Sequence, residues 1–194
     1  MSLGMKTGSQ KPAKTPTYQI PPRLTSGADL PSHNAMTSEQ IQQRIPHRGN
    51  MLLVDEIVSE TADSIVCRKT FRADEFFFDG HFPDSPIVPG VIQCECCLQA
   101  GAILLAGRSG DVAADAVPVA TRMDGVKFKK MVRPGDTVEI EATLNDQVSN
   151  AFYMTGKMKV GGKLAMRLDF SCSLSSPAPT PPSGSSRPDQ ETST

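Results

Sequence analysis

The stretch GVIQCECCLQAGAILLA, residues 90–106, determines the expected fold of this chain. Its apolar residues lie nearly all the way round a helix instead of along one stripe, so the rest of the protein should enclose that helix. At 1.5 Å per residue it would be about 25 Å long, which is too short to span a membrane. Pro89 suits its first turn, where a missing N–H costs nothing, and Gly107 with Arg108 suits its end.

Short strand patterns lie on both sides of this helix, and a capping box at Thr37 and Gln40 predicts a first helix over residues 38–44. The pattern allows a break at Asp124–Gly125 in the first strand after the long helix. About five or six strands result, joined by tight turns, so we expect an α+β fold with a curved antiparallel sheet wrapped around one central helix. The expected strands cover residues 50–61, 64–72, 117–132, 137–147, 151–160 and 163–174.

Both ends of the chain differ from its middle in composition. Residues 1–35 and 175–194 are polar and rich in Pro, Ser and Thr, and we expect both to be disordered because they can bury little apolar surface. The opening MSLG resembles a remnant of a cloning vector. One folded domain is therefore expected over residues 36–174.

Charge and cysteine content exclude several functions. The net charge is −1, so no general basic field would attract nucleic acid. The N-terminus lacks the apolar segment of a secretory signal, and an odd count of five cysteines argues against a disulfide framework, so we expect a cytoplasmic protein without membrane insertion. Cys94 and Cys97 form C-x-x-C without a second pair of ligands, so we expect small core residues and no metal.

One histidine and one glutamate flank the start of the long helix. Burial in an apolar helix should raise the pKa of Glu95 and let it act as a general acid, while His81 in the preceding Gly/Pro turn can act as a base. Backbone N–H groups near Gly90 could hold a developing oxyanion. Together they suit a dehydration, although a single loop histidine or helical glutamate is more often structural.

Three segments carry a resemblance to the 3-hydroxyacyl-acyl-carrier-protein dehydratases of fatty acid synthesis, covering roughly residues 40–173. They are IPHRGNMLLVDEI (45–57), FFFDGHFPDSPIVPGVIQCECCLQAGAIL (76–104) and VKFKKMVRPGDTVEIEATL (126–144). The resemblance implies the hotdog fold, His81 and Glu95 as the catalytic pair and the Gly90 N–H on the thioester oxygen. It also implies a homodimer, or a trimer of dimers, whose site takes its histidine and glutamate from different protomers. Related dehydratase/isomerases carry Asp at position 95, so the non-isomerising branch fits better.

We therefore expect dehydration of (3R)-3-hydroxyacyl-acyl-carrier-protein to the trans-2-enoyl form, with Gln99 orienting Glu95. No cofactor is expected, because phosphopantetheine arrives on the substrate. The alternatives are a hotdog thioesterase and a non-catalytic module that binds acyl carrier protein. Gln93, Cys94 and Val119 depart from the family pattern and leave the acyl-chain preference open.

Two further groups of residues have competing interpretations. His47 and Arg48 precede the first strand, where they could shape the mouth of the site, although a structural turn is favoured. A basic stripe could attract an acidic carrier protein or could simply be a solvated strand edge. The stripe consists of Lys127, Lys129, Lys130 and Arg133.

Overall fold

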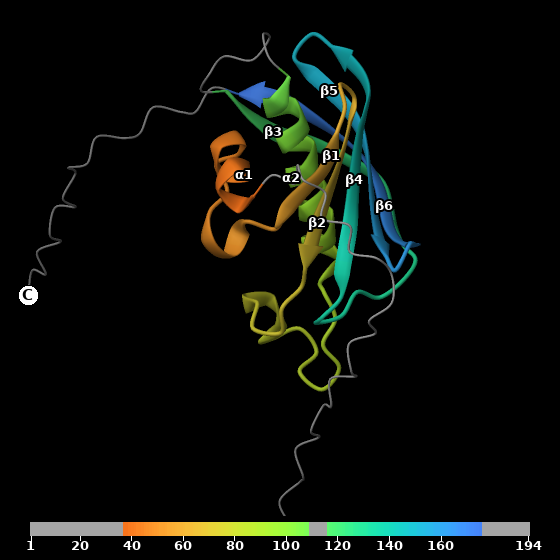
Figure 1. Ribbon diagram of the computed structural model, residues 1–194. Coiled ribbons are helices and arrows are strands. Elements are labelled where there is room, and N and C mark those ends of the chain that lie inside the picture. The colour runs from red at the N-terminus through yellow and green to blue at the C-terminus, as the bar shows by residue number, and fades with distance from the viewer. Residues whose placement is uncertain (1–36, 109–115, 176–194) are drawn as a thin grey trace, which may run out of the picture. The chain divides into compact units, whose positions relative to one another are not determined.

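A six-stranded antiparallel sheet curves around one long helix in the computed structural model, which describes residues 37–108 and 116–175 (Figure 1). The strand order is β1-β2-β4-β5-β6-β3, so the expected α+β arrangement is confirmed. The domain limits stay a prediction, because residues 1–36, 109–115 and 176–194 lie outside the described ranges. The strands are β1 (Glu56–Glu60), β2 (Ser64–Thr70), β3 (Val117–Phe128), β4 (Thr137–Val148), β5 (Ala151–Val160) and β6 (Lys163–Ser175).

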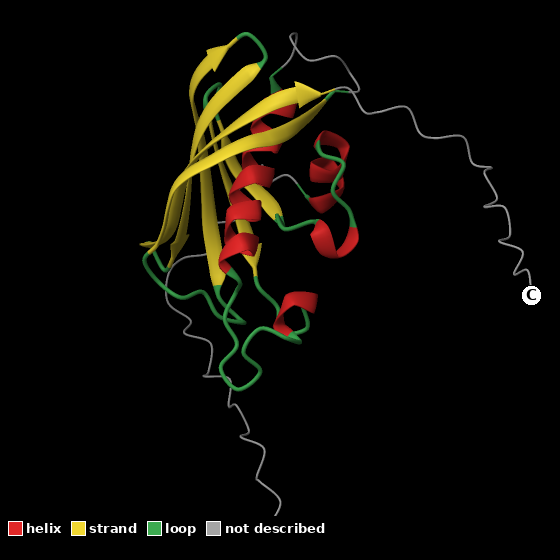
Figure 2. Ribbon diagram, turned by 180° about the vertical axis from the view of Figure 1, so that it is seen from behind, coloured by secondary structure: helices red, strands yellow, loops and turns green. Residues whose placement is uncertain are grey.

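The central helix α2 (Gly90–Gly107) lies along the inner face of the sheet (Figure 2). Small residues allow a close approach: a Cβ added at Gly156 on β5 would lie 2.8 Å from the Cβ of Cys97. All five cysteines are buried and free, as expected for core residues. The expectation that this helix is too short to span a membrane does not hold, because its 18 residues with a mean hydropathy of 1.4 are long and apolar enough. However, 61% of α2 is buried inside this fold, as is common for a core helix.

The segment before the sheet partly departs from the expectation. Helix α1 (Ser38–Arg44) forms as predicted, and the Thr37 N–H donates to Gln40 Oε1 at 2.8 Å. The strand expected over residues 50–61 is shorter, because a 3-10 turn occupies Gly49–Met51 and β1 begins only at Glu56. The reason is an interaction with a distant element. The side chain of Gln99 on α2 forms hydrogen bonds with backbone groups of this segment, and these groups therefore cannot pair with a strand.

Strand β3 lies at one edge of the sheet, opposite the edge formed by β1, and it pairs only with β6 among the described strands. It ends at Phe128, earlier than the expected residue 132, and its register shifts between Asp124 and Lys127 around Gly125, whose φ is +57°. The break expected there is thus a bulge within one strand. From Val119 to Phe128 every residue of β3 is exposed, including several large apolar side chains.

Candidate active site

His81 lies in the loop that leads into α2, and its ring orientation is fixed by the backbone. Its Nδ1 is 2.9 Å from the carbonyl oxygen of Ile87. A carbonyl only accepts, so Nδ1 carries the proton and Nε2 of the neutral ring is left with a free lone pair. The loop itself is held by Val88, whose N–H donates to Val132 O at 2.8 Å. The neutral ring can therefore accept a proton only at Nε2.

Gly90 begins α2, where the first N–H groups have no partner within the helix. A Cβ at this position would lie 2.7 Å from the ring of Phe128, so glycine permits the aromatic ring to cover the helix start. The positive end of the helix dipole suits a developing negative charge at this position.

Glu95 is only partly buried, with 26% of its side chain exposed. Its Oε1 accepts a hydrogen bond from Gln99 Nε2 at 2.9 Å and lies 3.4 Å from His47 Nε2. The contact with His47, followed by that with Gln99, holds the pKa of Glu95 below its ordinary value despite the opposing effect of burial. The expectation that burial raises this pKa was wrong, because the helix context gave no sign of a donor from another segment.

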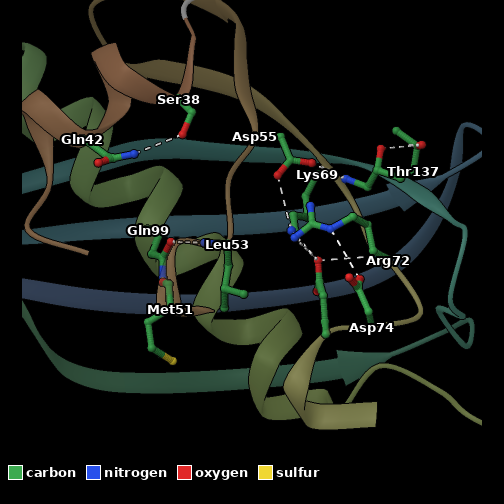
Figure 3. A network of polar contacts seen from close by, with 12 residues as sticks. Ser38, Gln42, Met51, Leu53, Asp55, Lys69, Arg72, Asp74, Gln99 and Thr137 are labelled. Carbon is green, nitrogen blue, oxygen red and sulfur yellow. Dashed lines mark hydrogen bonds and ion pairs between the residues drawn. The ribbon is translucent and has the colours of Figure 1, made fainter. Parts of the chain in front are cut away.

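Gln99 links Glu95 to the segment before β1. Besides bonding Glu95, its Nε2 donates to the carbonyl of Met51 at 2.7 Å, and its Oε1 accepts the N–H of Leu53 at 2.9 Å (Figure 3). Gln99 itself is buried. Three contacts from one amide group fix both the carboxylate and the neighbouring backbone, which is the geometry expected of an orienting residue.

Sequence reasoning missed a buried charge cluster beside this segment. Lys69 on β2 contacts Glu75 Oε1 at 2.7 Å and Asp55 Oδ1 at 3.3 Å, and Arg72 approaches Glu75 at 3.6 Å (Figure 3). A signal was present, since Lys69 follows Ile65 and Cys67 in the inward phase of the strand. The cluster joins β2 to the loop that carries the three phenylalanines before His81.

Not all of the expected site residues meet in one chain. In the part of the chain that the structure describes, no hydrogen bond or ion pair joins His81 to Glu95. The residues of the basic stripe are all exposed at the end of β3 and in the following loop, close to Phe128. None of them forms an ion pair within the described ranges, so both interpretations of the stripe remain.

The chain is similar to known dehydratases. The family model described as ApeI dehydratase (ApeI-like) matches residues 57–163. The 3-hydroxyacyl-acyl-carrier-protein dehydratase FabZ of Oenococcus oeni is 38% identical over 136 residues, which cover 70% of this chain and 96% of that relative. The FabZ of Thermomicrobium roseum is 41% identical over 127 residues, covering 65% and 84%. Among solved structures, the dehydratase heterocomplex ApeI:P from Xenorhabdus doucetiae matches with a TM-score of 0.60 at 16% identity, covering 70% of this chain and 90% of that one.

Proposed function

The chain belongs to the 3-hydroxyacyl-acyl-carrier-protein dehydratase family, and we propose that it converts a (3R)-3-hydroxyacyl thioester on acyl carrier protein into the trans-2-enoyl thioester in fatty acid synthesis. The observation that carries this proposal is the orientation of His81. Its Nδ1–H is committed to the Ile87 carbonyl, which leaves Nε2 as a base for the proton on the carbon next to the thioester.

The reaction then needs a proton for the leaving hydroxyl. Nε2 of His81 takes the α-proton, the bond between C3 and oxygen breaks, and Glu95 gives the proton that completes the water molecule. The imidazolium of His81 afterwards returns one proton to Glu95 through solvent, which restores the starting form. Because the pKa of Glu95 is lowered, most molecules hold Glu95 as the carboxylate. The reactive form, in which Glu95 carries the proton and His81 is neutral, is therefore a minor one.

The thioester carbonyl gains negative charge as the α-proton leaves. The N–H of Gly90, at the positive end of α2, is suited to bind that oxygen. Such a donor typically contributes about 10²–10³ in rate.

A second copy of the chain supplies the missing contact between the two catalytic groups in this proposal. Val91 on α2 is 76% exposed, and Met123 and Phe128 on the edge strand are about half exposed, which is costly for a lone chain and natural for a homodimer interface. His81 of one protomer would then act with Glu95 of its partner. Mixing inactive His81→Ala and Glu95→Ala proteins should restore about a quarter of the parent activity, because half of the dimers are mixed and each has one intact site.

The basic stripe offers a position for acyl carrier protein. Its residues flank Phe128, whose ring lies against Gly90 at the start of α2, and they form no ion pair with carboxylates of the described residues. Reversing the charge of Lys129 or Arg133 should raise KM for a carrier-bound substrate more than for a short pantetheine thioester. Equal effects on both substrates would favour a solvated strand edge.

The free, buried cysteines suit a cytoplasmic location.

Enoyl thioester formation from 3-hydroxyacyl carriers, followed by ultraviolet absorbance, tests the proposal. His81→Ala and Glu95→Gln should each lower kcat by at least about 10² while the circular dichroism spectrum stays that of the parent. Free thiol released without enoyl product would instead indicate a thioesterase. Binding of the acyl carrier without either product would indicate a non-catalytic module.

A further inference from the structure

We propose that His47 is a positioning residue for Glu95 and that Arg48 holds His47 in place. The inference rests on the proposed function for the role of Glu95 in the reaction. The contact itself is independent of that function, because His47 Nε2 lies 3.4 Å from Glu95 Oε1 in the free chain.

The two donors around Glu95 converge on the same oxygen. Gln99 Nε2 bonds Oε1 from the next turn of α2, and His47 Nε2 approaches Oε1 from the loop after α1. Oε2 accepts no hydrogen bond from any residue that the structure describes. Fixing one oxygen from two directions sets the plane of the carboxyl group, so Oε2 is the atom presented to the leaving hydroxyl.

Arg48 explains why the loop holds this geometry. Its Nη1 donates to the carbonyls of Ile45 and His47, and its Nη2 donates to the carbonyl of Gln42, each at 2.7 Å. Carbonyls at the end of a helix lack partners within it, and a guanidinium offers several donors in a rigid fork. Arg48 thus caps α1 and fixes the backbone of His47 with the same group.

A purely structural turn does not account for His47. The imidazole Nδ1 is buried and has no hydrogen-bond partner among the described residues. An unsatisfied buried nitrogen costs free energy, and a turn residue with its side chain in solvent would avoid that cost. The ring instead reaches across to α2, so the contact with Glu95 accounts for the position of the His47 side chain.

The contact also sets the charge of Glu95. The groups that face its carboxylate in the described ranges are His47 and Gln99, while the charge of Arg48 is directed at carbonyls. His47 makes the largest contribution to the lowered pKa of Glu95. Removing the imidazole should therefore let Glu95 hold its proton to higher pH and let the carboxyl group rotate.

The test measures Glu95 directly. The side-chain carboxyl carbons are labelled with ¹³C, the Glu95 signal is assigned by its loss in Glu95→Gln, and its titration is followed by NMR. His47→Leu fills a similar volume without a donor, and His47→Gln keeps an amide donor. Gln42→Ala is the matched control, because its side chain bonds only Ser38 among the described residues.

In His47→Leu the Glu95 signal should titrate at higher pH than in the parent, and the acid limb of kcat/KM should move the same way. Loss of orientation should lower kcat by roughly tenfold, with a smaller change in KM. His47→Gln should recover most of both effects, and Gln42→Ala should show neither. Arg48→Met should lower kcat in the same direction although His47 is present.

An unchanged Glu95 titration in His47→Leu would overturn the inference. The NMR measurement needs no substrate, so it decides the role of His47 even if the protein failed to dehydrate any hydroxyacyl thioester. An altered titration with no dehydratase activity in the parent would leave the inference standing and reject the proposed function.

Discussion

Replacing Lys69 with methionine should destabilise the fold far more than a surface substitution would. Lys69 is 2% exposed and its ammonium lies 2.7 Å from the carboxylate of Glu75, which is itself 8% exposed. Methionine fills a similar volume but leaves the Glu75 carboxylate buried without its main partner. The change therefore removes half of an ion pair that is almost out of contact with water.

Breaking a buried pair in this way typically costs about 3–5 kcal/mol. Two features place the value near the lower limit. Asp55, the other partner of Lys69, is 38% exposed and can rehydrate. The guanidinium of Arg72 lies 3.6 Å from Glu75 Oε1 and supplies a partial substitute. We therefore expect a loss of about 3 kcal/mol in the free energy of unfolding.

Urea unfolding followed by circular dichroism, at a fixed protein concentration, measures the change. The double variant Lys69→Met/Glu75→Gln should regain most of the loss, because no uncompensated charge remains. A loss below about 1 kcal/mol, the range of solvated surface pairs, would refute the reasoning. A double variant less stable than the single one would do the same.

Gly156→Ala should lower the free energy of unfolding by about 1–3 kcal/mol, as measured by scanning calorimetry. The reason is that the new Cβ would lie 2.8 Å from the Cβ of Cys97, and neither β5 nor α2 can move away. Gln99→Leu should cost more than about 2 kcal/mol in urea unfolding, because it leaves two backbone groups unpaired, and it should also lower kcat. Two lysines of β5 hold the pKa of Glu141 below 4.5, so this carboxylate stabilises the fold above that pH and loses its contribution as pH falls through the lowered pKa. Glu141→Gln should therefore melt below the parent at neutral pH, and the difference should shrink as the pH falls below 4.5 through the lowered pKa.

Local patterns predicted the elements that depend on local interactions. Helix α1 and strand β5 have the expected bounds, and α2 is one residue longer than expected. Capping, turn residues and the period of apolar residues determine these elements, and all three can be read along the chain. The same applies to the strand count and to the antiparallel character of the sheet, since tight turns join several of the strands.

Interactions between distant segments explain what the sequence did not reveal. The early start expected for β1 failed because the amide of Gln99 competes for the backbone of Met51 and Leu53. The pKa of Glu95 was predicted with the wrong sign, because the donor on His47 belongs to another element. Spacing and periodicity give no sign of the contacts that Gln99 and Glu95 make with distant segments. Only the tertiary structure reveals these contacts.

The position of β3 in the sheet affects how the chain can fold during its synthesis. Its hydrogen-bonding partner is β6, the last of the described strands, with Val117 opposite Ser175 and Phe128 opposite Met166. While the ribosome is still making β6, the whole of β3 has emerged without a strand to pair with. The long segment between β3 and β6 also slows their pairing, because bringing its ends together costs conformational entropy. The ring that covers the start of α2 belongs to β3, so the proposed oxyanion site at Gly90 can be completed only after β6 leaves the exit tunnel. A nascent chain stalled before that point should bind chaperones through its exposed edge strand and should have no dehydratase activity.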